Sequence, residues 1–388
     1  MVFLRRLIPL FKFSRLRHVW PMRFRSHFLP PPGCICVAGM LIFAATIFVS
    51  PAADYPAPES GDFTIHDFHF QSGETLPELR IHYRTLGKPR RDSRDIVTNA
   101  VLILHGTTGN GGNFIRPEFA GELFGSGQPL DAATHFVILP DGIGHGQSSR
   151  PSDGLHAKFP HYGYPDMIEA QYRLVTDGLK VNHLRLVMGT SMGGMHTWLW
   201  GELHPDFLDA LLPLASLPTQ ISGRNRVWRR MIIDAIRNDP EWLNGDYQTQ
   251  PQGLKVAAEV LWFMGNNPVQ RQKEAPTREQ ADKVLDASIN NSMKTLDANN
   301  VLYALEASRD YDPGPGLEKI TAPLLAINFA DDLINPPELG ILEREITRVK
   351  HGQALVWPAT DQTRGHGTHT LAAVWKEKFV DFLKQTQH

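Results

Sequence analysis

The stretch that most constrains this 388-residue chain is LRLVMGTSMGGMHTW, residues 184–198. It begins as an apolar strand, turns at Gly189–Gly194 and continues with the spacing of a helix. A serine between glycines at such a strand–turn–helix junction is typical of the G-x-S-x-G nucleophile elbow. The backbone at the tip is strained, and Gly189 and Gly193 let the strand and the helix approach one another. We therefore predict that Ser191 is a nucleophile, with a plain glycine turn as the alternative.

Strands and helices alternate on either side of this turn, which is typical of a mostly parallel sheet covered by helices. Continuous apolar runs predict buried strands at 99–104, 136–139, 210–215, 323–329 and 354–357. Alternating apolar and polar residues predict a pair of antiparallel strands at 63–71 and 79–85. Helical spacing is found at 164–179, 337–349 and 369–383.

The strand signal disappears between residues 217 and 316. Helical spacing takes its place at 224–237, 253–264, 278–293 and 299–308. We interpret residues 217–316 as a helical lid insertion in a core formed by residues 53–216 and 317–388.

The first 52 residues differ from the rest of the chain. They carry seven Lys and Arg, no acidic residue and an apolar run at 34–49, which is followed by small residues. This order is typical of a signal peptide, and we expect a periplasmic or secreted protein. The alternative is an uncleaved membrane anchor over 34–49, although sixteen apolar residues are slightly short for a membrane span. Cys34 and Cys36 both lie here, so the rest of the chain has no thiol for a disulfide, a nucleophile or a zinc site.

Composition argues against several classes of partner. Beyond residue 52 the chain has 32 basic and 41 acidic residues, a net charge of −9, which gives no support for nucleic-acid binding. The glycines of 106–112 do not have the dinucleotide-binding spacing. We expect no cofactor and no metal, because the loose candidates lack ligand spacing: His105, His145, His161 and His196. The expected partner is a small-molecule ester or acyl donor, and the sequence is compatible with a homodimer.

A serine nucleophile needs a base, and the base needs an acid that orients it. In elbow proteins the acid follows a late strand and the histidine follows the last strand. Asp331 and Asp332 follow the strand at 323–329, and His366 and His369 follow the last strand. One aspartate of such a pair is usually solvated or caps a turn. His366 lies between glycines that let a loop present its ring, whereas His369 begins the predicted closing helix, so each choice stays open here.

Acyl transfer also needs backbone amides that stabilise an oxyanion. One is expected from Met192, directly after the nucleophile. The other is expected from the glycine-rich loop at 105–112, where Thr107 is the candidate. The alternative for this loop is a tight turn without a catalytic part.

These residues, with several motifs in the same order, resemble the homoserine O-acetyltransferase family of the α/β-hydrolase superfamily. The likeness extends over residues 97–375 and implies an α/β-hydrolase fold with a mostly parallel central sheet and a helical lid insertion. The motifs are GQSSRPS (146–152), GTSMGGMH (189–196), DPEWLNGDY (239–247) and DLINPP (332–337).

The resemblance also implies roles for single residues. The family's acid precedes a proline by four residues, which matches Asp332, and its base follows a glycine, which matches His366. An arginine in the family's insertion binds the substrate carboxylate. Arg229 lies in the matching stretch, where the alternative is an exposed helix charge, and Tyr247 also stands at a matching position.

One position departs from the family. Gly367 stands where the family has an aspartate that meets the amino group of homoserine. Loss of such a charge-assisted contact costs about 1.5–3 kcal/mol, and acetyl-CoA is a cytoplasmic donor. We therefore predict an exported serine hydrolase that acts on a carboxylic ester through an acyl-enzyme. The alternatives are an O-acyltransferase with an acyl-CoA donor and a non-catalytic binding protein on the same scaffold.

Overall fold

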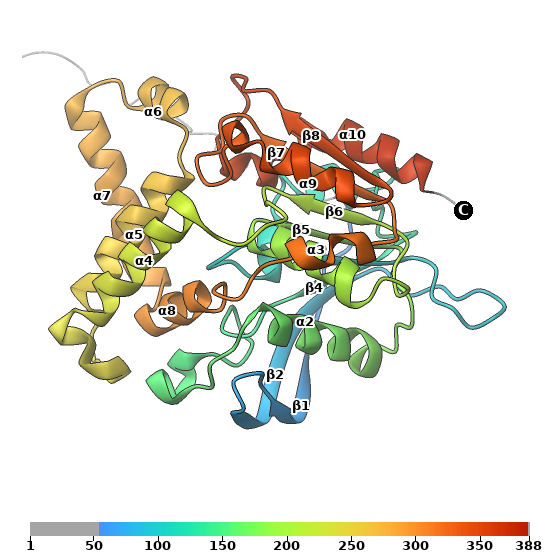
Figure 1. Cartoon of the computed structure of the whole chain (residues 1–388), viewed down its shortest axis with the longest axis horizontal. Coiled ribbons are helices and arrows are strands. Elements are labelled where there is room, and N and C mark those ends of the chain that lie inside the picture. The colour runs from blue at the N-terminus through green and yellow to red at the C-terminus, as the bar shows by residue number, and fades with distance from the viewer. Residues whose placement is uncertain (1–53, 387–388) are drawn as a thin grey trace, which may run out of the picture. The chain divides into compact units, whose positions relative to one another are not determined.

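A computed structural model of the chain describes residues 54–386, in which an eight-stranded sheet lies between helices (Figure 1). The strands, in spatial order, are β1 (Glu59–His69), β2 (Thr75–Leu86), β4 (Phe136–Pro140), β3 (Ala100–Leu104), β5 (Leu186–Thr190), β6 (Leu211–Leu214), β7 (Leu324–Phe329) and β8 (Gly352–Trp357). β2 pairs antiparallel with β1 and β4, and the remaining pairs are parallel. The predicted α/β-hydrolase fold with a mostly parallel sheet is confirmed.

The central strand β3 shows why its sequence is continuously apolar. Leu102 and Leu104 pack on the sheet face covered by α2 (Tyr164–Arg173) and α3 (Met192–Leu203). The intervening residues Val101 and Ile103 pack on the opposite face, against α1 (Ala120–Leu123) and α10 (Ala372–Gln385). A strand buried on both faces needs apolar residues at every position.

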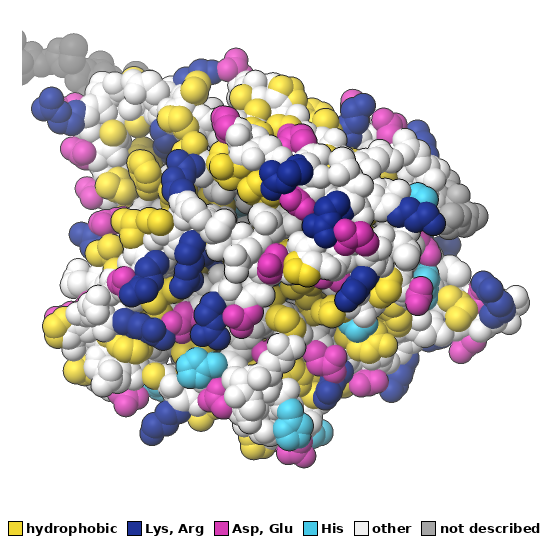
Figure 2. All heavy atoms as spheres, viewed as in Figure 1, with side chains coloured by type: hydrophobic (Ala, Val, Ile, Leu, Met, Phe, Trp, Pro, Cys, Tyr) yellow, Lys and Arg dark blue, Asp and Glu magenta, His cyan; other side chains and the backbone are white. Residues whose placement is uncertain are grey.

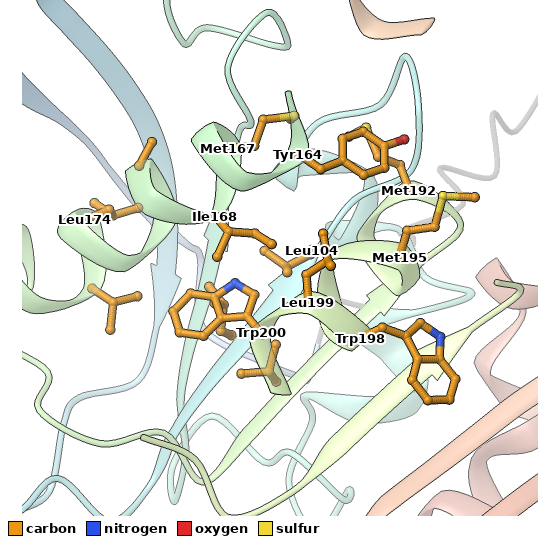
Figure 3. Close-up of a cluster of buried hydrophobic side chains, with 14 of the residues drawn as sticks. Leu104, Tyr164, Met167, Ile168, Leu174, Met192, Met195, Trp198, Leu199 and Trp200 are labelled. Atoms are coloured by element: carbon orange, nitrogen blue, oxygen red, sulfur yellow. The ribbon is translucent and has the colours of Figure 1, made fainter. Parts of the chain in front are cut away.

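Helix α3 follows the turn at Ser191 and is held by large buried side chains. Trp198 and Trp200 project from opposite sides of this helix (Figure 3). The indole of Trp198 donates to Ser216 Oγ at 3.2 Å, and that of Trp200 donates to Gln171 Oε1 at 2.9 Å. Because both indole N–H groups have acceptors, the two rings can be buried against the core without leaving a polar group unpaired.

The helices between β6 and β7 gather on one side of the sheet (Figure 1). They are α4 (Gly223–Arg237), α5 (Gln252–Gly265), α6 (Pro268–Glu274), α7 (Arg278–Thr295) and α8 (Ala298–Glu306). Their buried residues form a cluster separate from the sheet's core, with Trp228, Ile236 and Leu302 among its members. The sequence predicted four of these helices and missed α6, which has no buried residue to give it an apolar period.

Three predicted helices differ from the structure at their ends. The helix predicted at 337–349 is broken at Gly340, whose φ of 60° is left-handed, and only α9 (Ile341–Glu345) is α-helical. The segment 164–179 is α-helical to Arg173 and continues as a π-turn. The closing helix begins at Ala372, because residues 367–370 form a 3₁₀ turn.

The signal or anchor predicted at 34–49 lies outside the described residues. From residue 54 to residue 386, no helix has the length and apolar character needed to cross a membrane.

Candidate active site

The turn at Ser191 has the geometry of the predicted elbow. Ser191 has φ 55° and ψ −113°, which is strained for a residue with a side chain. A Cβ at Gly189 would lie 2.1 Å from the carbonyl oxygen of Gly193. A Cβ at Gly193 would lie 1.9 Å from the carbonyl oxygen of Leu104. Only glycine allows these approaches, so the two glycines are required by packing.

Ser191, His366 and Asp332 form a continuous hydrogen-bonded chain. The Nδ1 atom of His366 lies 2.8 Å from Asp332 Oδ2, and its Nε2 atom lies 2.8 Å from Ser191 Oγ. A carboxylate only accepts hydrogen bonds, so Nδ1 carries the proton and Nε2 is free to accept the serine proton. This is the arrangement in which an imidazole can act as a general base toward a hydroxyl.

The Asp332 carboxylate is buried and fully paired. Its Oδ1 accepts the amides of Ile334 and Asn335, and its Oδ2 accepts His366 Nδ1 and the Asn335 side-chain amide. Burial alone would raise the pKa of Asp332, but its electrostatic interaction with the His366 ring and these hydrogen bonds hold it below its usual value. Asp332 therefore stays ionised opposite the imidazole. No sequence pattern predicted that Asn335 would bind the carboxylate of Asp332.

Asp331 has a different environment from its neighbour. Its Oδ2 accepts the Thr363 hydroxyl at 2.8 Å and the Gly365 amide at 3.0 Å. It also accepts a hydrogen bond from Asn267 at the start of α6. One aspartate of the pair was expected to be solvated or to cap a turn; Asp331 instead holds the loop that carries His366.

His369 is neither a surface residue nor the beginning of the closing helix. It is buried in the 3₁₀ turn, with its ring 5.1 Å from that of His366 in an edge-to-face arrangement. Burial, and then the neighbouring His366, lower the pKa of His369 to about 3, so its ring is neutral. Its Nδ1 has no hydrogen-bond partner in the described part of the chain.

The predicted oxyanion amides lie on the two segments next to Ser191. Met192 is the first residue of α3, where helix geometry leaves amides without an internal acceptor. The loop of Thr107 passes beside Ser191, since a Cβ on Gly106 would lie 3.3 Å from Ser191 Cβ. Within residues 54–386, neither the Met192 amide nor the Thr107 amide donates a hydrogen bond. Both are available to an oxyanion, and their role stays a prediction.

Ser191 and His366 open into a cavity of about 260 Å³. Thr107 lines this cavity, together with His369 and Arg116, neither of which the sequence singled out as part of a substrate site. The cavity therefore extends from the loop of Thr107 to Ser191.

Arg229 is buried in α4, which contradicts the alternative of an exposed helix charge. Its guanidinium donates to Asn225 Oδ1 at 2.9 Å and to Ser308 Oγ at 3.0 Å, and lies over the Trp228 ring. Burial lowers the pKa of Arg229 from its usual value. Arg229 does not line the Ser191 cavity, and its contact with a substrate carboxylate stays a prediction.

Tyr247 belongs to the same helical region. Its hydroxyl donates to Asp297 Oδ2 at 2.7 Å and accepts the Asn299 amide at 3.1 Å. These contacts tie Tyr247 to the beginning of α8, away from the residues that line the Ser191 cavity. Its substrate role likewise stays a prediction.

The buried histidines near the sheet edge are held by local contacts. His105 Nδ1 donates to the Gly106 carbonyl, and its Nε2 accepts the Gly142 amide. His145 Nδ1 donates to the Ile143 carbonyl, and His196 Nδ1 accepts from Gln171. Over the described range there is no group of three His, Cys, Asp or Glu side chains placed to hold a metal ion.

Comparison with known proteins agrees with this architecture. The α/β-hydrolase fold family matches residues 99–347. A homoserine O-acetyltransferase from Haloferax prahovense is 30% identical over 324 residues, covering 71% of this chain and 75% of that protein. The crystal structure of a homoserine O-acetyltransferase from Bacillus anthracis superposes with a TM-score of 0.74 at 21% identity, covering 84% of this chain and 98% of that chain.

An esterase is similar in fold to nearly the same extent. The crystal structure of esterase E22 superposes with a TM-score of 0.72 at 18% identity, covering 84% of this chain and all of that chain. At this identity the likeness shows the fold alone. The family match and the sequence relative together establish that the chain belongs to the α/β-hydrolase fold family, among the homoserine O-acetyltransferase-like proteins.

Proposed function

We propose that the protein hydrolyses a carboxylic ester through an acyl-enzyme. The observation that carries this proposal is the chain of two 2.8 Å contacts that joins Ser191 Oγ to His366 and His366 to Asp332. Ser191 attacks the ester carbonyl while His366 takes its proton, and the amides of Met192 and Thr107 hold the oxyanion. His366 then returns the proton to the leaving alcohol. Water then attacks the acyl carbon while His366 takes its proton, and the bond to Ser191 Oγ breaks as His366 returns that proton to the serine, which releases the carboxylic acid.

The test uses 4-nitrophenyl acetate and a fluorophosphonate probe. The wild-type protein releases a burst of 4-nitrophenol, and the probe labels Ser191. Ser191→Ala loses the burst and the label, because no other group replaces the nucleophile. An unchanged burst in Ser191→Ala contradicts the assignment of the nucleophile. Failure of the wild-type protein to label favours the binding-protein alternative.

O-acyl transfer from an acyl-CoA is the second candidate, and it is supported by the chain's similarity to homoserine O-acetyltransferases. Gly367 argues for hydrolysis, since no carboxylate stands at that position to bind an acceptor's ammonium group. Incubation with acetyl-CoA and homoserine separates the two reactions. Formation of O-acetylhomoserine faster than acetate favours transfer, and acetate alone favours hydrolysis.

We also propose export, on the basic and apolar character of the first 52 residues. N-terminal sequencing of the protein from fractionated cells tests this. A mature chain that begins shortly after residue 50 in the exported fraction supports a cleaved signal. The intact segment in the membrane fraction supports an anchor, and the intact chain in the cytoplasm contradicts export.

A further inference from the structure

We infer that the Ser191 cavity selects esters that carry a carboxylate close to the scissile bond. This inference rests on the proposed hydrolysis and names its substrate class. Among the residues that line the cavity, Arg116 is the one Lys or Arg, and none is an Asp or Glu. On the face shown in Figure 2, by contrast, acidic and basic side chains are interspersed.

Arg116 has no competing partner in the described part of the chain. It lies directly after the 3₁₀ turn Gly111–Ile115, and its guanidinium makes no ion pair or hydrogen bond with residues 54–386. Arg116 is exposed at the cavity wall, where its guanidinium presents a planar set of donors that matches a carboxylate. The cation is therefore available to a ligand.

Two neutral donors accompany this cation. Asn113 lines the cavity, and its side-chain oxygen accepts the Asn110 amide, which leaves its NH₂ group facing no acceptor in residues 54–386. His369 also lines the cavity and is more than nine-tenths buried; its Nδ1 is enclosed without a partner, so Nε2 is the ring nitrogen through which it can meet a ligand. A neutral imidazole carries one N–H that can donate to an anion.

The two aspartates that follow β7 do not oppose this charge. Asp332 is separated from the cavity by the His366 ring, and its oxygens are occupied by hydrogen bonds. Asp331 is bound to Thr363 and Gly365, outside the cavity lining. A carboxylate in the cavity therefore meets a cation and neutral donors, whereas an ammonium group meets a cation without a partner of its own.

Two matched ester pairs test the inference, each differing by a carboxylate against a carboxamide. Ethyl hydrogen succinate and ethyl succinamate place the group on the acyl side. O-acetylglycolate and O-acetylglycolamide place it on the alcohol side. We expect kcat/KM for the anionic member of at least one pair to exceed that of its amide about three- to tenfold, the range for a partly exposed charge contact. The pair that shows the preference identifies the side on which the carboxylate lies.

Arg116→Gln should bring this ratio close to one. Arg94→Gln is the matched control, because Arg94 is 79% exposed, pairs with Asp92 and lies outside the cavity. It should leave the ratio unchanged. Fluorophosphonate labelling of Ser191 shows whether the Arg116 variant is folded, and Arg116→Lys, which keeps the charge, should restore part of the preference if Arg116→Gln is poorly folded.

Several results overturn the inference. Turnover of both pairs without a preference for the carboxylate overturns the substrate class alone and leaves the proposed hydrolysis intact. A preference that persists in folded Arg116→Gln overturns the assignment to Arg116. No turnover of any of the four esters, with Ser191 unlabelled, contradicts the proposed function itself and the inference with it.

Discussion

Asp331 and Asp332 are adjacent in the chain, yet each binds a different part of the loop that carries His366. Asp332 accepts the imidazole Nδ1 at 2.8 Å, whereas Asp331 accepts the Gly365 amide at 3.0 Å, one residue earlier in the loop. One carboxylate orients the ring, and the other holds the backbone from which the ring projects. We therefore expect substitution of Asp332 to affect catalysis and substitution of Asp331 to affect mainly stability.

Asp332→Asn should reduce kcat for ester hydrolysis about 10³- to 10⁴-fold, with little change in KM. An asparagine amide facing His366 favours the imidazole tautomer that cannot accept the serine proton. Steady-state kinetics with 4-nitrophenyl acetate measure the loss. Circular dichroism should show the same fold as the wild-type protein.

Asp331→Asn is expected to act mainly on stability. It replaces an oxygen that accepts from Thr363, Gly365 and Asn267 by a group with fewer acceptor sites. Loss of buried hydrogen bonds to a charged acceptor costs on the order of 1–3 kcal/mol. Urea unfolding should show this decrease, and kcat should fall less than about tenfold. A stable Asp331→Asn protein with activity as low as that of Asp332→Asn would contradict the assignment of the acid.

Gly193→Ala should destabilise the protein by about 1–3 kcal/mol and also reduce kcat. The added methyl group would meet the Leu104 carbonyl oxygen at 1.9 Å, so β3 and α3 must move apart. That movement displaces the neighbouring Met192 amide. Gly121→Ala in α1 is the matched control, because its Cβ meets nothing within 4 Å. Helix propensity predicts a small gain in stability there. Equal unfolding free energies for the two variants would contradict the close approach.

The elbow and its partners were predictable because they depend on local chemistry and chain order. A serine between glycines after a buried strand is a local pattern, and the acid and the base follow later strands whose apolar runs are continuous. The choice of Asp332 over Asp331 needed the family resemblance. Both aspartates follow β7, and sequence alone does not show which one faces the imidazole.

Burial of polar side chains was the main feature that the sequence did not predict. Arg229 and His369 are typical surface residue types, yet both are buried, and Arg229 contacts Ser308, which is distant in the sequence. Arg116 carried no pattern at all, because its place in the cavity depends on how the loop after β3 folds back. Such positions are set by tertiary packing.

Glu202 in α3 predicts a pH dependence of stability. Burial, with smaller effects of nearby Asp312 and Glu318, raises the pKa of Glu202 from 4.5 to about 8, although Lys319 and Arg348 lower it. The folded state holds this proton more tightly than the unfolded state, so the stability it contributes is lost as pH rises from 4.5 toward 8. Glu202→Gln should match the wild-type free energy of unfolding near pH 5.

At about pH 9 the Glu202→Gln protein should be more stable by about 1–2 kcal/mol, with allowance for solvent screening of a half-buried group. Urea unfolding across this range measures the difference. The control is Glu78→Gln on β2, where the carboxyl is exposed and makes no ion pair in residues 54–386. The same dependence on pH in this variant would contradict the assignment of the effect to the burial of Glu202. A Glu202 difference that is constant with pH would contradict the raised pKa.

Gly367→Asp tests why this chain departs from homoserine O-acetyltransferases. A Cβ at Gly367 meets nothing within 4 Å, and its φ lies outside the left-handed region, so an aspartate fits without strain. The new carboxylate would bind an ammonium group, and such a contact contributes about 1.5–3 kcal/mol. Transfer of acetyl from acetyl-CoA to homoserine should therefore increase about tenfold or more.

Gly367→Asn has nearly the same shape without the charge and should show little increase. Hydrolysis of anionic esters should fall in the aspartate variant alone, since the added charge repels a carboxylate beside Arg116. Equal behaviour of the aspartate and asparagine variants would mean that charge at this position does not decide the acceptor.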